Sequence, residues 1–209
     1  MPTPTIKAIS TFYAGHYFRS RLEARWAVFF DTCGIKWEYE KEGYSLPSGP
    51  YLPDFWLPKV SLRDGKPGVW VEIKPVMYTQ EEERKPIGLA RETDAPVMIL
   101  CGSGFYIGNG TYEGFQVQVE KKTKEQKMEE WPSLSLEDLK DFDGHETWID
   151  NCMSLHKCVN PNCGDVKFEF DNHNYWFCSE CSWPTTDEPF RRAAVYAQCE
   201  RFESPKRAR

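Results

Sequence analysis

The sequence predicts an α/β protein in which a mixed central sheet is flanked by helices, followed by a small C-terminal element. Three observations predict it: a helical apolar pattern over residues 17–33, short strand-like runs near residues 51–57 and 69–74, and two spaced cysteine pairs after residue 155. With 209 residues and 40% hydrophobic residues, the chain is long enough to bury a substantial core.

The first predicted helix covers Tyr17–Cys33, because large apolar residues recur there at helical spacing and Gly34 follows as a stop signal. Trp37–Tyr44 alternates apolar and charged residues, which is typical of a half-buried strand. Tyr51–Leu57 follows a Pro- and Gly-rich turn and predicts a second strand, at an edge or irregular because it contains Pro53.

Val69–Lys74 is the most strand-like run of this half of the chain. Thr79 and Glu82 form a capping box that predicts a helix toward Glu92, which Pro86 should kink or split. Two further strands are expected at residues 96–101 and 115–120, and a short helix after residue 135.

These patterns divide the chain into a core at residues 1–125, a polar and acidic connector at 126–154, a cysteine-containing element at 155–185, and a helix with a basic tail at 186–209. The last helix is predicted from Glu188 to Phe202. No charged and apolar leader and no apolar run of about 20 residues is visible, which favours a cytoplasmic protein without a membrane partner.

The main chemical signal is a group of charged residues inside apolar strands. Asp54 follows Pro53, and Glu72 and Lys74 stand 18 and 20 residues after it. Alternation along a strand places Glu72 and Lys74 on the same face, with Ile73 on the opposite face. Two carboxylates suit a hard divalent cation, and a lysine beside them can move a proton or stabilise negative charge. This combination favours metal-assisted phosphodiester hydrolysis.

A simpler interpretation has to be weighed against this one. Asp54 alone would serve to cap a turn, and Glu72 with Lys74 would serve as a solvated strand face. The flanking residues are apolar, however, and unpaired charge among buried residues is costly, so a shared site is favoured. Glu23, on the first helix, is explained either by this site or by an ion pair with Arg19 one turn away.

The second signal is the cysteine arrangement. Cys158 and Cys163 form one pair and Cys178 and Cys181 form another, with fourteen residues between the two pairs. Strands at residues 166–170 and 175–177 are predicted between them, so two cysteine turns and a hairpin indicate a zinc ribbon. Four thiolates would make a closed, structural zinc site.

The first pair has four residues between its cysteines where two are commoner, which leaves the ligand set open. Cys152, His156 or His173 would be the replacement for one cysteine. Cys33, Cys101 and Cys199 stand alone and are expected to be small core residues.

The net charge of −6 excludes a protein coated in basic surface, although both ends of the chain are locally basic. Basic residues near the acidic motifs are candidates for phosphate contacts, with a solvated helix face as the alternative. They are Arg19, Arg21, Arg25, Arg84 and Lys85.

The order of helix, strand with Pro53-Asp54 and strand with Glu72-Ile73-Lys74 resembles the PD-(D/E)XK nuclease superfamily, whose core is restriction-endonuclease-like. Together with Arg19–Glu23, it is similar to small phage nucleases and to the endonuclease subunit of heteromeric bacterial transposases. The resemblance covers about residues 13–100 and rests on three short motifs in the right order.

The resemblance implies a Mg²⁺- or Mn²⁺-dependent deoxyribonuclease of phage or mobile-element origin, acting in a bacterial or phage-infected cell, alone, as a homodimer or in a larger nucleoprotein complex. Asp54 and Glu72 would hold the metal with the Ile73 carbonyl, Lys74 would act on the attacking water or the phosphate, and Glu23 would complete the acidic cluster. The alternatives are a non-catalytic DNA-binding or assembly protein and a transcription-related zinc-ribbon factor.

Overall fold

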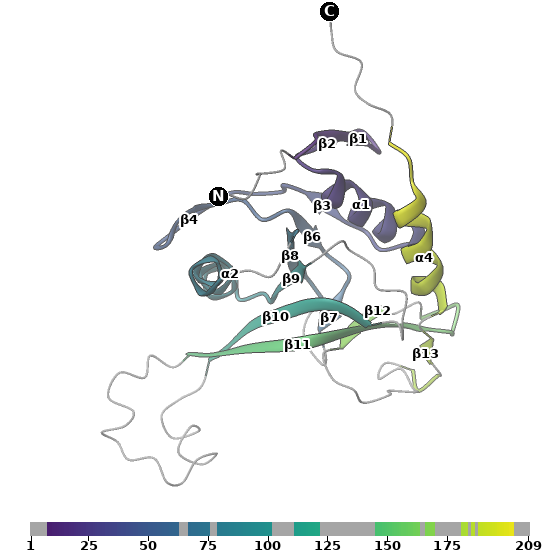
Figure 1. Ribbon diagram of the computed structural model, residues 1–209. Helices are drawn as coiled ribbons and strands as arrows, with labels where there is room; N and C mark the ends of the chain where they lie inside the picture. Colours follow the sequence, from purple (N-terminus) through teal and green to yellow (C-terminus); the bar gives the residue numbers. More distant parts are fainter. Residues whose placement is uncertain are drawn as a thin grey trace, which may run out of the picture.

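The computed structural model describes residues 8–62, 67–75, 79–101, 111–121, 145–163, 166–169, 181–183, 185–186 and 188–202. Within these residues the protein is α/β, with a mixed sheet of nine strands and three helices (Figure 1). At the centre of the sheet, β8 (Val69–Lys74) pairs antiparallel with β6 (Phe55–Leu57) and parallel with β9 (Val97–Cys101).

On one side, β3 (Glu38–Tyr39) pairs antiparallel with β6. On the other side, β9 is followed by β10 (Thr111–Lys121) and β11 (His145–Cys158), two long antiparallel strands. β12 (Val166–Glu169) pairs with β11 and, in parallel, with β7 (Ser61–Leu62), while β13 (Thr185–Thr186) also pairs with β11.

Two small hairpins lie outside this sheet. β1 (Thr11–Tyr13) and β2 (His16–Phe18) form one, and β4 (Tyr44–Leu46) and β5 (Gly49–Tyr51) form the other. The second hairpin leads directly into the Pro53-Asp54 turn before β6, so it positions the start of that acidic motif.

The helices begin and end where capping residues stand. α1 (Arg21–Cys33) starts after Ser20, whose side chain accepts from the Glu23 amide, and ends at Gly34 in the left-handed region with φ 72°. α2 (Gln80–Thr93) has Thr79 as its N-cap in a capping box with Glu82, as predicted. α4 (Glu188–Cys199) packs against α1 (Figure 1).

The central sheet separates two apolar cores because successive strand residues face opposite sides. Val69, Val71 and Ile73 join the core that contains α1 and α4. Trp70 joins the other core, with Leu89 of α2. Glu72 and Lys74 follow Trp70 in this alternation, so they stand on the α2 face of the sheet.

Several sequence-based expectations need correction. The first helix is shorter than predicted, since residues 16–18 form β2, and the strand expected at Trp37–Tyr44 contributes only β3 and the first residue of β4. α2 continues through Pro86 as one helix, which is neither split nor ended there. A tight turn at Glu40 (φ 44°) interrupts the predicted strand, and a turn at Gly15 (φ 86°), just before the predicted helix, joins β1 to β2.

The predicted connector at 126–154 is wrong for residues 145–154, which belong to β11. Nine register pairs with β10 hold them in the sheet, and that pairing outweighs their polar composition. β12, expected to pair within a separate ribbon, pairs with β11 and β7 and so extends the main sheet. The short helix expected after residue 135 and the strand expected at 175–177 lie outside the described residues.

Candidate functional site

Asp54 lies in the turn before β6 and is almost completely buried, with a side chain only 5% exposed. Its Oδ2 accepts a 2.7 Å hydrogen bond from the backbone amide of Ile73, and its Oδ1 forms a 2.5 Å ion pair with Nη2 of Arg19. Burial raises the pKa of Asp54, and the negative charges of Glu72 and Glu23 raise it further. The acid is therefore held at a place where negative charge is unfavourable unless a cation accompanies it.

Glu72 and Lys74 share one face of β8, as strand alternation predicts. Lys74 Nζ lies 3.1 Å from Glu72 Oε1, and the hydroxyl of Tyr51 donates to Glu72 Oε2 at 3.0 Å. Asp54 and Glu72 are thus brought together from neighbouring strands, with Lys74 beside them, and each of the four carboxylate oxygens has a hydrogen-bond or ion-pair partner.

Burial lowers the pKa of Lys74, but the charges of Glu72 and Glu82 raise it more, and the result lies above the ordinary value. Glu82 Oε1 is 3.7 Å from Lys74 Nζ. Lys74 in this arrangement is a protonated ammonium group that can stabilise negative charge.

A cavity of about 530 Å³ opens between β8, the β4–β5 hairpin and α2. Glu72 and Lys74 line it together with residues from the hairpin and from the first turns of α2. Its full lining is Arg19, Pro50, Tyr51, Leu52, Glu72, Lys74, Thr79, Glu82, Lys85 and Pro86. Three cationic and two anionic side chains thus face one space, so a phosphate group entering it meets net positive charge.

Glu23 is buried at the start of α1 but is held by other partners. Ser20 Oγ donates to its Oε1 at 2.6 Å, and Tyr39 donates to its Oε2 at 2.6 Å. The Arg19 amide also donates to Oε2 at 3.1 Å. Among the described residues, Glu23, Asp54 and Glu72 do not form a group of three carboxylates within 4.8 Å of one another. Glu23 therefore fixes the entry to α1 and adds negative charge near Asp54.

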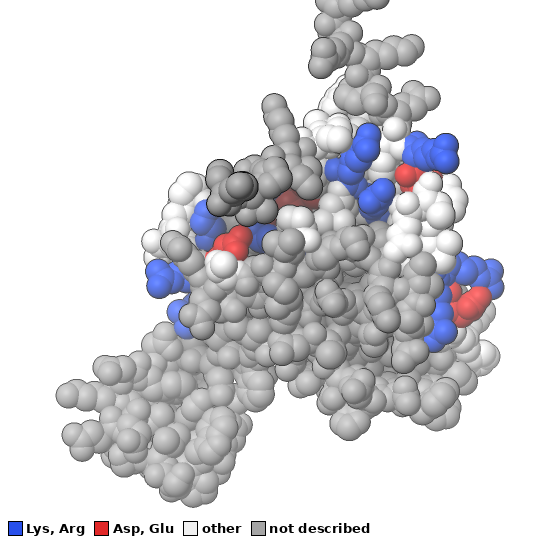
Figure 2. Space-filling view, viewed as in Figure 1, with Lys and Arg blue, Asp and Glu red and all other residues white. Residues whose placement is uncertain are grey.

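The other basic candidates are spread over several elements. Lys85 lines the cavity, and its Nζ donates to the Pro50 carbonyl at 3.2 Å. Arg84 and Arg21 are exposed, and Arg25 is half-buried on α1. Figure 2 shows the described basic side chains of one face standing next to acidic ones, without a continuous basic surface among them.

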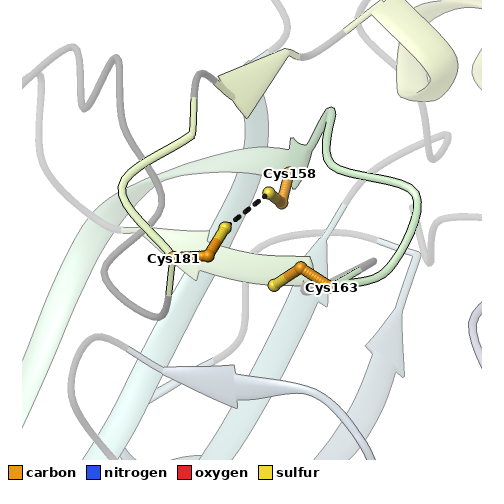
Figure 3. A group of neighbouring side chains, drawn as sticks. All are labelled: Cys158, Cys163 and Cys181. Carbon is orange, nitrogen blue, oxygen red and sulfur yellow. Dashed lines mark hydrogen bonds between the residues drawn. The ribbon is translucent and has the colours of Figure 1, made fainter.

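Three cysteines near the C-terminus form a second candidate site (Figure 3). The sulfur atoms of Cys158, Cys163 and Cys181 all lie within 4.8 Å of one another, so this group could hold a metal ion. Cys158 ends β11 and is buried, and Cys163 follows a turn in which its amide donates to the Asn160 carbonyl at 3.1 Å. Cys33 and Cys199 are free thiols.

The local geometry favours thiolates. Cys158 Sγ and Cys181 Sγ are 3.4 Å apart, close to the roughly 3.8 Å expected in a tetrahedral site with Zn–S bonds of about 2.3 Å. A hydrogen bond from the Trp183 backbone, together with smaller contributions from the neighbouring cysteines, lowers the pKa of Cys181 to about 7. Cys178 and His173 lie outside the described residues, as do the side chains of Cys152 and His156.

Sequence reasoning assigned no role to three residues of the first site. Tyr51 was used only as part of a motif, Glu82 only as a helix cap, and Glu40 not at all. Glu40 Oε1 lies 2.8 Å from Arg19 Nε, so it holds the arginine from the side opposite Asp54. The capping box was a usable signal for Glu82, because the first turn of the helix after β8 returns toward Lys74.

Comparisons of the chain with protein-family models, with curated proteins and with solved structures find no match. Of the helices that the described residues form, none has the length and apolar character that crossing a bilayer requires. The arrangement of the side chains is therefore the basis for an inference about function.

Proposed function

We propose that the chain is a metal-dependent nuclease of the PD-(D/E)XK superfamily that hydrolyses DNA phosphodiester bonds, with a restriction-endonuclease-like core. One observation carries the proposal: the buried carboxylate of Asp54 and the half-buried carboxylate of Glu72 lie near the ammonium group of Lys74, and Glu72 and Lys74 line a cavity that also has Arg19 and Lys85 on its wall. A binding module needs cations for phosphate contacts but has no need of acids at the same place.

The donor set of this site fits Mg²⁺ or Mn²⁺. Both prefer oxygen ligands, and Mg²⁺ commonly uses one or two carboxylates and keeps several water molecules. Asp54 and Glu72 would hold the cation, with the Ile73 carbonyl as a third ligand. The raised pKa of Asp54 supports this, because burial and the neighbouring acids make its charged form unfavourable without added positive charge. When bound, such a cation polarises the phosphate and lowers the pKa of a bound water.

The chain's own residues would do the remaining work. Lys74, protonated and 3.1 Å from Glu72, would stabilise the negative charge that develops on the phosphate during in-line attack. Tyr51 and Glu82 would orient Glu72 and Lys74, respectively, since each contacts one of them at the cavity wall. Lys85, on the same wall, would contact a phosphate of the substrate backbone.

For the cysteine group we propose a structural zinc ion held by Cys158, Cys163, Cys178 and Cys181. Thiolate ligands with this local geometry favour zinc over a hard cation, and four thiolates leave no open coordination position for a substrate. The ion would fasten the end of β11 to the segment that precedes β13.

The test is cleavage of plasmid, linear duplex, branched and single-stranded DNA with Mg²⁺ or Mn²⁺. The wild type should cut at least one substrate, and Asp54→Ala and Lys74→Ala should each lose at least about 100-fold in rate, as expected when an interaction worth about 3 kcal/mol in the transition state is removed. Lys36→Ala, an exposed lysine outside the cavity lining, is the matched control and should cut like the wild type.

A wild type that cuts nothing, yet binds DNA as well as both variants do, would contradict the proposal. That result would favour the non-catalytic DNA-binding or assembly protein. The substrate panel also distinguishes an enzyme that acts on duplex ends or junctions from one that acts on single strands.

A further inference from the structure

Arg19 contacts Asp54 and also lines the cavity, and its backbone and side chain differ in how they are held. Its backbone amide is fixed, because it donates at 3.1 Å both to Glu23 Oε2 and to the Tyr39 hydroxyl. Its side chain is 55% exposed and lines the cavity. A long side chain on a fixed base can exchange one partner for another within its reach without any change in the fold.

The guanidinium group is the cation closest to Asp54 Oδ1. Nη2 pairs with that oxygen, and Nε pairs with Glu40 Oε1 at 2.8 Å and lies 4.0 Å from Glu23 Oε2. The other oxygen of Asp54 accepts from the Ile73 amide, so Oδ1 is the oxygen that faces a partner able to move. A divalent cation at Asp54 would therefore meet the positive charge of Arg19 at close range.

We propose that Arg19 is a positioning residue that couples metal binding to phosphate binding: it neutralises Asp54 until a backbone phosphate draws its guanidinium into the cavity, and this release increases the affinity of Asp54 for the divalent cation. The inference rests on the proposed nuclease function and deepens it. Guanidinium groups pair with phosphate in the same two-pronged geometry as with carboxylate, so the exchange replaces one strong partner by another.

The coupling suits a nuclease because the metal ion and the substrate then bind cooperatively. By linkage, a phosphate that increases metal affinity is itself bound more tightly when the metal is present, by the same factor. Lys74 is paired differently, since its ammonium group contacts Glu72 and Glu82 and forms no ion pair with Asp54 among the described residues.

The test measures Mn²⁺ affinity by the loss of the free-ion paramagnetic resonance signal, using zinc-loaded full-length protein. Wild type, Arg19→Met, Arg91→Met and Asp54→Asn are compared with and without a short DNA duplex, which is checked afterwards for intactness. Arg91 is the matched control, an exposed arginine of α2 outside the cavity lining. Thermal unfolding confirms that each variant is folded.

We expect DNA to tighten Mn²⁺ binding to the wild type at least about fivefold, the lower end of usual coupling between sites. Arg19→Met should bind Mn²⁺ at least about fivefold more tightly than the wild type without DNA, and DNA should add little further. Arg91→Met should match the wild type without DNA. A merely structural arginine would give the opposite result, because its loss would leave Mn²⁺ affinity equal or weaker.

An Arg19→Met variant whose Mn²⁺ affinity without DNA is unchanged or weaker would overturn the coupling while leaving the nuclease proposal intact. The proposed function fails in a different way: wild type and Asp54→Asn would then bind Mn²⁺ equally poorly with and without DNA. That outcome would overturn both.

Discussion

The backbone amide of Ile73 donates a 2.7 Å hydrogen bond to Oδ2 of Asp54, so the acid in the turn before β6 is bound to the C-terminal end of the neighbouring strand β8. Because Glu72 and Lys74 flank Ile73, this single bond sets the distance between the two acidic motifs. The register of β6 against β8, with Phe55 opposite Val71, maintains the same relationship through the sheet.

Replacing Asp54 with Asn should stabilise the protein in buffer without added divalent cations. Burial, then Glu72 and Glu23, raises the pKa of this acid, so the folded state binds more protons than the unfolded state between the two pKa values. Stability from this group is complete below the unfolded pKa and decreases as the pH rises toward the folded one. Asp54→Asn should therefore gain about 1 kcal/mol or more near pH 8, or about 2–4 °C in Tm, with little gain near pH 4. A lower Tm near pH 8 would contradict this.

Removing the hydroxyl of Tyr51 should affect catalysis more than stability. A hydrogen bond to a charged group contributes about 1.5–3 kcal/mol, and here it orients Glu72 at the cavity wall. Tyr51→Phe should lower kcat about 10- to 100-fold. Tyr44→Phe is the matched control, because Tyr44 makes a similar bond to Glu42 on the exposed surface. Equal rates for the two variants would show that Tyr51 only fills space.

Serine at Cys158 should release bound zinc and destabilise the protein. The wild type should carry about one zinc ion per chain, the number that one closed thiolate site holds, and Cys158→Ser should lose most of it with a clear fall in Tm. Elemental analysis of purified protein measures the metal. Cys199→Ser, at an exposed cysteine of α4, should keep the zinc and the Tm of the wild type. Equal zinc content in both variants would exclude Cys158 as a ligand.

Truncating Phe190 tests whether α4 belongs to the main core. This side chain is fully buried, and its ring centroid lies 6.4 Å from that of Phe29. Phe190→Ala should cost about 3–5 kcal/mol in the free energy of unfolding, measured by chemical denaturation. Tyr196→Ala, at an exposed position of the same helix, should stay within about 0.5 kcal/mol of the wild type. A small loss for Phe190→Ala would mean that α4 is only loosely attached.

Cys33 should resist alkylation in the folded protein. Burial raises its pKa to about 12, so only about one molecule in ten thousand is a thiolate near pH 8. Mass spectrometry of labelled peptides should show rapid modification of the exposed Cys199 and slow modification of Cys33, with both labelled in denaturant. Comparable native rates would place Cys33 nearer the surface than the structure does.

Local sequence patterns correctly predicted the elements whose bounds depend on neighbouring residues alone. The bounds of β8 follow from a run of β-forming residues, and the start of α2 follows from Thr79 and Glu82. The same alternation predicted that Glu72 and Lys74 share a face. The grouping of Cys158, Cys163 and Cys181 followed from their spacing, and the structure brings these three together.

Other features depend on contacts between residues far apart in the sequence, and local patterns did not predict them. No local pattern in residues 145–154 predicts a strand. Their pairing with β10 places them in the sheet. Arg19 and Asp54 are 35 residues apart, so the turns before α1 and β6 had to be placed before their ion pair could be recognised.

The parallel pairing of β7 with β12 has a consequence for how the chain is made. Ser61 pairs with Lys167, which leaves the ribosome 106 residues later, a delay of about 5–20 seconds at ordinary rates of synthesis. During that time β7 cannot pair with β12. β12 begins three residues after Cys163 and ends before Cys181, so the segment that closes this sheet edge lies between two cysteines of the group that could hold a metal ion. A metal ion held there would therefore also restrain the strand that completes the pairing of β7.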